Sequence, residues 1–194
     1  MKSFRTYKQL FLVLCLAFTS AVLSGQNNKT GDVYVPEVGQ QGKDVVWVPT
    51  PQELVDTMLS IAKVTPADYL IDLGSGDGRT VISAAKRGAR ALGIEYNPDM
   101  VRLSRRNAEK EGVSGKAEFI EADLYEADLS KATVITMFLL PEINLKLRPR
   151  LLDLKPGTRI VSNTFTMGEW EADREVTTDD NWNTRLQLPV RSRM

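Results

Sequence analysis

The sequence predicts an α/β fold: a mostly parallel sheet with helices on both faces and a possible antiparallel hairpin at the C-terminus. Short apolar runs typical of strands alternate with amphipathic segments of helical length between residues 51 and 162. A glycine-rich turn directly follows the first of these runs. The 194 residues are enough for one domain with a sizeable core.

The first predicted helix spans residues 51–63. Thr50 is expected as its N-cap, Pro51 at the first helical position and Glu53 three residues after the cap, which is the pattern of a capping box. Apolar residues then recur at helical spacing, namely Leu54, Met58 and Ile61.

Strands and helices alternate from there to residue 162. Strands are predicted at 69–73, 91–95, 117–120, 133–138 and 158–162. Helices are predicted at 79–87, 97–111 and 142–154, the second with Asn97 as cap and Pro98 at its first position. Helices of this length between strands imply right-handed βαβ crossovers. Two weaker strands, 174–177 and 185–188, would form the hairpin, and Pro189 interrupts the second.

The N-terminus has the layout of a secretory signal peptide. A basic start, an apolar stretch from Leu10 to Leu23 and two small residues make up residues 1–25. Cleavage would make the protein exported, periplasmic or secreted. An uncleaved segment would anchor it to a membrane, and a helix buried in the fold is a further alternative. Residues 26–44 are polar and predict a linker or arm, which leaves residues 45–194 as the folded domain.

Composition excludes several kinds of chemistry. The chain has no histidine, and its one cysteine, Cys15, lies in the apolar N-terminal stretch. Histidine bases, thiol nucleophiles and thiolate zinc sites are therefore excluded from the folded domain, and no metal site is expected. Lys and Arg number 25, as do Asp and Glu, so no basic excess points to nucleic acid as a partner.

The glycine-rich turn combines flexible backbone with carboxylates. It contains Asp72, Gly74, Ser75, Gly76, Asp77 and Gly78. In the dinucleotide fingerprint the third glycine comes one residue later and the turn faces a pyrophosphate. Two carboxylates beside a pyrophosphate would be unfavourable. They suit a ligand that carries cations, such as the α-ammonium and sulfonium of S-adenosylmethionine (SAM).

Residues after the next two strands complete an adenosine site. Glu95 ends the second strand, 23 positions after Asp72, where a carboxylate can accept hydrogen bonds from both ribose hydroxyls. Tyr96 can lie against an adenine ring. After the third strand, Asp123 can accept from the adenine amino group, and Leu124 can pack on the base.

Three stretches resemble the first three motifs of class I SAM-dependent methyltransferases, which have a Rossmann-like fold: YLIDLGSGDGR, GIEYNPDM and IEADLYE. The resemblance covers about residues 45–165. It implies that SAM is bound by the Gly74–Gly78 turn, by Glu95 at the ribose and by Asp123 at the adenine. Asp72 would lie near the methionine part or orient the turn.

Two further stretches, VWVPTPQELVDTML and FLLPEINLKLRPRL, are similar to the FAM173-type protein-lysine methyltransferases. The segment Val48–Pro51 is either a lid over the methionine end or only the start of a helix. Glu142 is the candidate catalytic residue, holding an ammonium substrate in place; the alternative is an acid favoured by the helix dipole. Trp47 and Trp170 are either a substrate wall or packing residues.

The predicted function is SAM-dependent transfer of a methyl group to an amine, with a protein lysine as candidate acceptor. No Asn-Pro-Pro-Tyr motif follows the fourth strand, which argues against adenine-N6 and glutamine-amide transfer. Any proton acceptor must be a carboxylate, a tyrosine or a backbone carbonyl. The alternatives are a small-molecule methyltransferase and a non-catalytic SAM-binding protein. Membrane association is expected only through residues 1–25.

Overall fold

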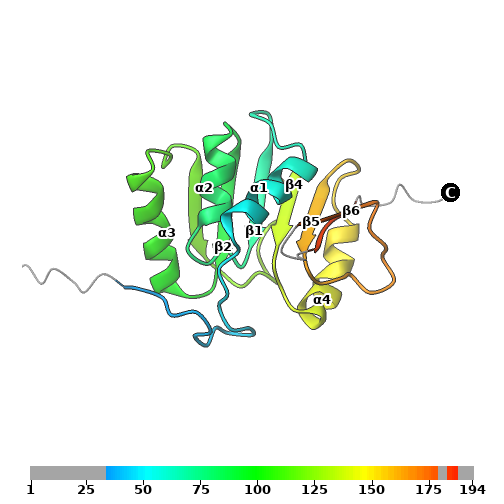
Figure 1. The fold of residues 1–194 in the computed structure, drawn as a ribbon, viewed down its shortest axis with the longest axis horizontal. Helices are drawn as coiled ribbons and strands as arrows, with labels where there is room; N and C mark the ends of the chain where they lie inside the picture. Colours follow the sequence, from blue (N-terminus) through cyan, green and yellow to red (C-terminus); the bar gives the residue numbers. More distant parts are fainter. Residues whose placement is uncertain (1–33, 179–182, 188–194) are drawn as a thin grey trace, which may run out of the picture. The chain divides into compact units, whose positions relative to one another are not determined.

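The computed structural model describes residues 34–178 and 183–187 (Figure 1). The predicted targeting segment at residues 1–25, part of the predicted arm and Pro189 lie outside the described residues. From Tyr34 onward the chain packs as one compact unit. In this part of the chain no helix has both the length and the apolar character needed to cross a membrane.

A seven-stranded sheet forms the centre of the fold, with the strand order β3-β2-β1-β4-β5-β7-β6 (Figure 1). The first five strands in this order are parallel, and β7 runs antiparallel to both β5 and β6. The strands are β1 Tyr69–Leu73, β2 Arg90–Glu95, β3 Ala117–Glu121, β4 Val134–Met137, β5 Arg159–Asn163, β6 Arg174–Thr177 and β7 Asn183–Gln187. The predicted α/β class and the C-terminal hairpin are therefore confirmed.

Helices cover both faces of the sheet. They are α1 Gln52–Ile61, α2 Arg79–Lys86, α3 Pro98–Lys110 and α4 Pro141–Leu152. Buried side chains of α1, α2 and α3 form one core cluster with the sheet, and α4 packs in a second cluster. The strand order reverses between β1 and β4, and ligands bind beyond the carboxyl ends of strands at such a point.

The two predicted helix starts have different outcomes. At α3 the Asn97 side chain accepts a hydrogen bond from the Asp99 backbone N–H at 2.9 Å, so this cap is confirmed. The prediction of a capping box at α1 is wrong. Pro51 is itself the N-cap residue, with an extended ψ of 145°, and no side chain caps the helix. The helix thus begins one residue later than predicted, which shifts Thr50 and Glu53 out of the capping positions.

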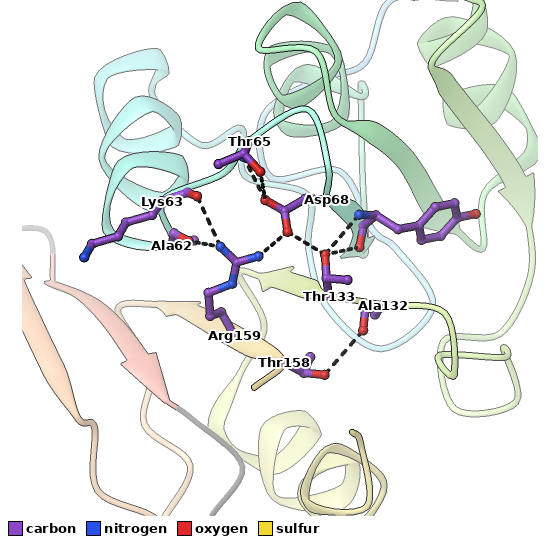
Figure 2. A network of polar contacts seen from close by, with 9 residues as sticks. Ala62, Lys63, Thr65, Asp68, Ala132, Thr133, Thr158 and Arg159 are labelled. Carbon is purple, nitrogen blue, oxygen red and sulfur yellow. Dashed lines mark hydrogen bonds and ion pairs between the residues drawn. The ribbon is translucent and has the colours of Figure 1, made fainter. Parts of the chain in front are cut away.

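At the opposite end of the sheet, Asp68 joins the starts of three strands (Figure 2). Its carboxylate accepts hydrogen bonds from the Thr65 N–H at 2.7 Å, the Thr65 hydroxyl at 3.0 Å and the Thr133 hydroxyl at 2.8 Å. It also pairs with the Arg159 guanidinium. Burial by itself raises the pKa of Asp68, but these hydrogen bonds and the Arg159 charge outweigh it and lower the pKa.

Arg159 also closes the C-terminal end of α1 (Figure 2). Its Nη1 donates to the carbonyl of Ala62 at 2.6 Å and to that of Lys63 at 3.1 Å. A cation is favourable there because the last carbonyls of a helix carry partial negative charge. One guanidinium therefore ties α1 to the start of β5 and, through Asp68, to β1.

Candidate cofactor site

A cavity lies at the carboxyl ends of β1, β2 and β4, beside the reversal of strand order. Every residue predicted to bind the cofactor, except Gly78, lines it: Asp72, Gly74, Ser75, Gly76, Asp77, Glu95, Tyr96, Asp123 and Leu124. The structure thus brings together residues from three separate strand ends. Their roles toward a ligand remain predictions.

The glycine-rich turn has the backbone conformation that glycine allows. Gly74, Gly76 and Gly78 have φ angles of +74°, +54° and +84°. A Cβ at Gly78 would lie 2.7 Å from the ring of Phe119 and 2.8 Å from the Cβ of Ser104. Gly78 therefore serves the close packing at the start of α2 rather than the cavity.

Glu95 is fixed at the edge of the cavity by the backbone. Its Oε2 accepts from the Gly76 N–H and its Oε1 from the Asn97 N–H, both at 2.9 Å. Each carboxylate oxygen has a second lone pair, so both can still accept a hydroxyl hydrogen. This geometry suits the predicted contact with two ribose hydroxyls.

Asp72 is the buried acid of the cavity, 6% exposed. The Thr136 hydroxyl donates to its Oδ1 at 2.6 Å. Burial raises the pKa of Asp72 to about 7, with the Thr136 hydrogen bond opposing the rise and the charges of Glu95 and Asp77 adding to it. Asp77 is itself paired with Arg79. A cation placed near Asp72 would favour its ionised form.

Lys43 is the site residue that the sequence does not indicate. Its Nζ donates to Asp123 Oδ2 at 2.6 Å and lies 4.6 Å from the centre of the Tyr96 ring. The other Asp123 oxygen accepts from the Tyr125 N–H at 2.8 Å. The hydrogen bonds from Lys43 and then from Tyr125 lower the pKa of Asp123.

Lys43 belongs to a segment, residues 39–50, that we call the strap. The strap is folded on itself by hydrogen bonds from Gly39 N to Trp47 O at 2.8 Å and from Trp47 N to Gln40 O at 2.9 Å. Its far end is fixed because Arg79 Nη1 donates to the carbonyl of Thr50 at 2.8 Å.

Most of the strap lines the cavity, including Trp47 and Val48–Thr50. This favours a covering role for that segment over a mere helix start. Trp47 lies against Gly76, where its Nε1 would be 2.6 Å from an added Cβ. Trp170, in contrast, packs against the core cluster beneath α4 and does not line the cavity.

The end of the cavity beyond the acids is apolar. Met137, Phe138 and Leu139 line it after β4, and Ile143 lines it from α4. Glu142 is exposed on the first turn of α4 and is not among the lining residues. The structure therefore places this candidate catalytic residue outside the cavity, and its role stays a prediction.

The residues of the cavity suit a cationic adenosyl ligand. Carboxylates lie along one part and apolar side chains along the other, while its two cationic groups, Lys43 and Arg79, are each paired with an acid. A diphosphate would meet uncompensated negative charge here. Within the described ranges no group of three or more acidic residues is placed to hold a metal ion.

Comparisons with known proteins agree with this site. The sequence profile of the ANTKMT methyltransferase domain matches residues 72–174. A protein-lysine N-methyltransferase of Saccharolobus islandicus is 43% identical over 161 residues, covering 81% of this chain and 96% of the relative. A human lysine N-methyltransferase named for ATP synthase is 34% identical over 128 residues, covering 66% of this chain and 54% of the relative.

One solved structure shares much of the sequence as well as the fold. It is described as an RNA methyltransferase from Salinibacter ruber in complex with S-adenosyl-L-homocysteine. It is 50% identical, with a TM-score of 0.71, and the match covers 73% of this chain and 93% of that chain. The names of these relatives give two kinds of substrate, protein lysine and RNA, so the names alone do not decide the acceptor.

Proposed function

We infer that this protein, which belongs to the ANTKMT methyltransferase domain family and is a SAM-dependent methyltransferase, methylates lysine side chains of a protein. One observation carries the choice of acceptor. The similarity to the protein-lysine N-methyltransferase of Saccharolobus islandicus extends over 96% of that relative. The chain spans only 54% of the human relative, so nothing more specific than a protein lysine is proposed.

The residues at the acidic end of the cavity would hold the cofactor. SAM supplies a methyl group on a sulfonium, ready for in-line displacement by a nucleophile. Glu95 would accept from the ribose hydroxyls, Asp123 from the adenine amino group, and Asp72 would face the cationic methionine part. These contacts fix the orientation of the cofactor, and much of the rate gain in group transfer comes from such positioning.

The apolar end would receive the lysine. Burial disfavours the charged form of an amine, so the apolar side chains of Met137, Phe138 and Ile143 promote loss of the ammonium proton before transfer. They also exclude water from the reacting groups. Glu142, one residue before Ile143 and exposed, is a candidate to attract the ammonium before it enters.

A labelling experiment tests the acceptor. Purified protein is incubated with methyl-labelled SAM and an extract of the cells from which the gene derives. We expect label in protein, recovered as methyl-lysine after hydrolysis, and no label with Glu95→Ala. Label removed by ribonuclease would contradict the proposal and favour RNA, the substrate named for the Salinibacter ruber structure. The balance of 25 basic and 25 acidic residues argues against that outcome, because nucleic-acid binding depends on phosphate contacts by Lys and Arg.

We also propose that residues 1–25 target the protein to or across a membrane. Their basic start and short apolar stretch support this. Fractionation of the source cells with N-terminal sequencing tests it. A protein shortened by about 25 residues in the exported fraction is expected after signal cleavage. A full-length chain in the soluble cytoplasmic fraction would contradict the proposal.

A further inference from the structure

Lys43 makes the two contacts that the adenine ring is expected to make. Its ammonium donates to Asp123 Oδ2 at 2.6 Å, the oxygen available for the adenine amino group because Oδ1 accepts from the Tyr125 N–H. The same ammonium lies 4.6 Å from the centre of the Tyr96 ring, the face against which the base would lie. Lys43 and adenine therefore require the same carboxylate oxygen and the same aromatic surface.

The strap that carries Lys43 is built to move as a unit. Its own backbone hydrogen bonds, between Gly39 and Trp47 and between Gln40 and Trp47, hold it together independently of the rest of the fold. Val46 and Val48 are 44% and 42% exposed, so opening the strap would uncover little apolar surface. The bond from Arg79 to the Thr50 carbonyl fixes its end and leaves the preceding part free to swing.

We propose that Lys43 competes with the adenine of the cofactor, so that the strap is a latch which cofactor binding must release. The proposal rests on the assignment of this cavity to SAM. Binding then includes the loss of an exposed ion pair and of a cation–π contact. Contacts of this kind lower the apparent affinity by about threefold to tenfold.

Calorimetry with S-adenosyl-L-homocysteine tests the latch. Lys43→Met removes the charge and keeps an apolar side chain, and we expect it to bind the ligand about threefold to tenfold more tightly than the wild type. Lys43→Arg keeps the charge and should stay near the wild-type affinity. Lys86→Met is the matched control, because Lys86 pairs with Glu111 at the same distance of 2.6 Å and neither residue lines the cavity.

Ionic strength gives a second readout. Between about 0.01 M and 1 M salt the Debye length falls from about 30 Å to about 3 Å, which weakens exposed ion pairs. Affinity for S-adenosyl-L-homocysteine should therefore rise with salt in the wild type and in Lys86→Met, and stay level in Lys43→Met. A purely structural role for Lys43 would not produce this difference.

The other outcomes overturn the proposal. Unchanged affinity in Lys43→Met would mean that Lys43 and the ligand do not compete. Weaker binding would mean that Lys43 contacts the cofactor directly. A wild-type protein that binds no S-adenosyl-L-homocysteine would refute the assignment of the cavity itself, a failure distinct from that of the latch.

Discussion

The buried carboxyl of Asp72 links cofactor binding to pH. Its pKa of about 7 reflects burial first, and the nearby charges of Glu95 and Asp77 as well. A sulfonium or α-ammonium beside it would favour the ionised form, so binding should release a proton near neutral pH. SAM affinity is expected to increase between about pH 6 and 8, and Asp72→Asn should remove the dependence. Calorimetry in two buffers of different ionisation enthalpy measures the proton, and a wild type that releases none would contradict this.

The same carboxyl should make the free protein less stable as pH rises. In the unfolded chain it titrates near 3.8, so between that value and about 7 only the folded state retains the proton. Stability therefore decreases across this window, by about 1.4 kcal/mol for each unit of pKa shift, or about 4 kcal/mol in all. Urea unfolding at several pH values checks this. Asp72→Asn should show a shallower decline, and identical slopes would refute the expectation.

Gly78 is required for packing rather than for the cofactor. An alanine there would have both a left-handed φ and a Cβ pressed against Phe119 and Ser104. Gly112 has a similar φ of +69° with nothing within 4 Å, so Gly112→Ala measures the backbone strain alone. We expect Gly112→Ala to cost about 1–2 kcal/mol and Gly78→Ala about 2 kcal/mol more, from overpacking. Equal losses in urea unfolding would show that the close contacts at Gly78 relax freely.

Individual site residues can be predicted where they follow a strand directly. Asp72, Glu95 and Asp123 are of this kind, because the carboxyl ends of parallel strands meet at one edge of the sheet. Lys43 is not, since its partner is 80 positions away and no periodic pattern relates the two. Glu142 shows another limit: adjacent residues of a helix point in different directions, and it is Ile143 that lines the cavity.

At the scale of helices and strands, the polar network at the base of the sheet should determine how firmly α1 is attached. Arg159→Met would leave the Asp68 carboxylate without its cation and the last carbonyls of α1 without a donor. Asp68 retains three hydrogen bonds, so we expect a loss of about 2 kcal/mol, below the usual cost of breaking a fully buried pair. Urea unfolding at neutral pH gives the value.

Arg87→Met is the control for that variant. Arg87 also reaches α1, through an ion pair with Asp56 at 3.1 Å, but that carboxylate is 55% exposed and the pair should contribute less than about 1 kcal/mol. Because the pKa of Asp68 is lowered, its contribution is present above pH 3.8 and disappears as the pH falls below that value. The two variants should therefore converge in stability at low pH. An Arg159→Met protein as stable as Arg87→Met at neutral pH would contradict this account.

Elements defined by local signals are predicted closely. The first strand is expected at 69–73 and is Tyr69–Leu73, and the cap of α3 is the predicted Asn97. The start of α1 differs from the prediction by one residue because sequence does not reveal the ψ of Pro51, which decides whether this proline is the first helical residue or the cap. The network of Asp68 and Arg159 has no sequence signal, since the two lie 91 positions apart and meet only after the sheet has formed.

At the scale of the whole molecule, the cavity is lined from strand ends across the middle of the sheet, from α1 and α4 and from the strap. A cofactor held by all of these binds only the folded chain, so its binding energy adds to the free energy of unfolding. At a ligand concentration of about 100 times Kd the gain is about 2.7 kcal/mol. We expect S-adenosyl-L-homocysteine to produce this gain in urea unfolding, and NADH, whose pyrophosphate the carboxylates disfavour, to produce none at the same concentration. Stabilisation by NADH alone would mean that the turn binds a dinucleotide.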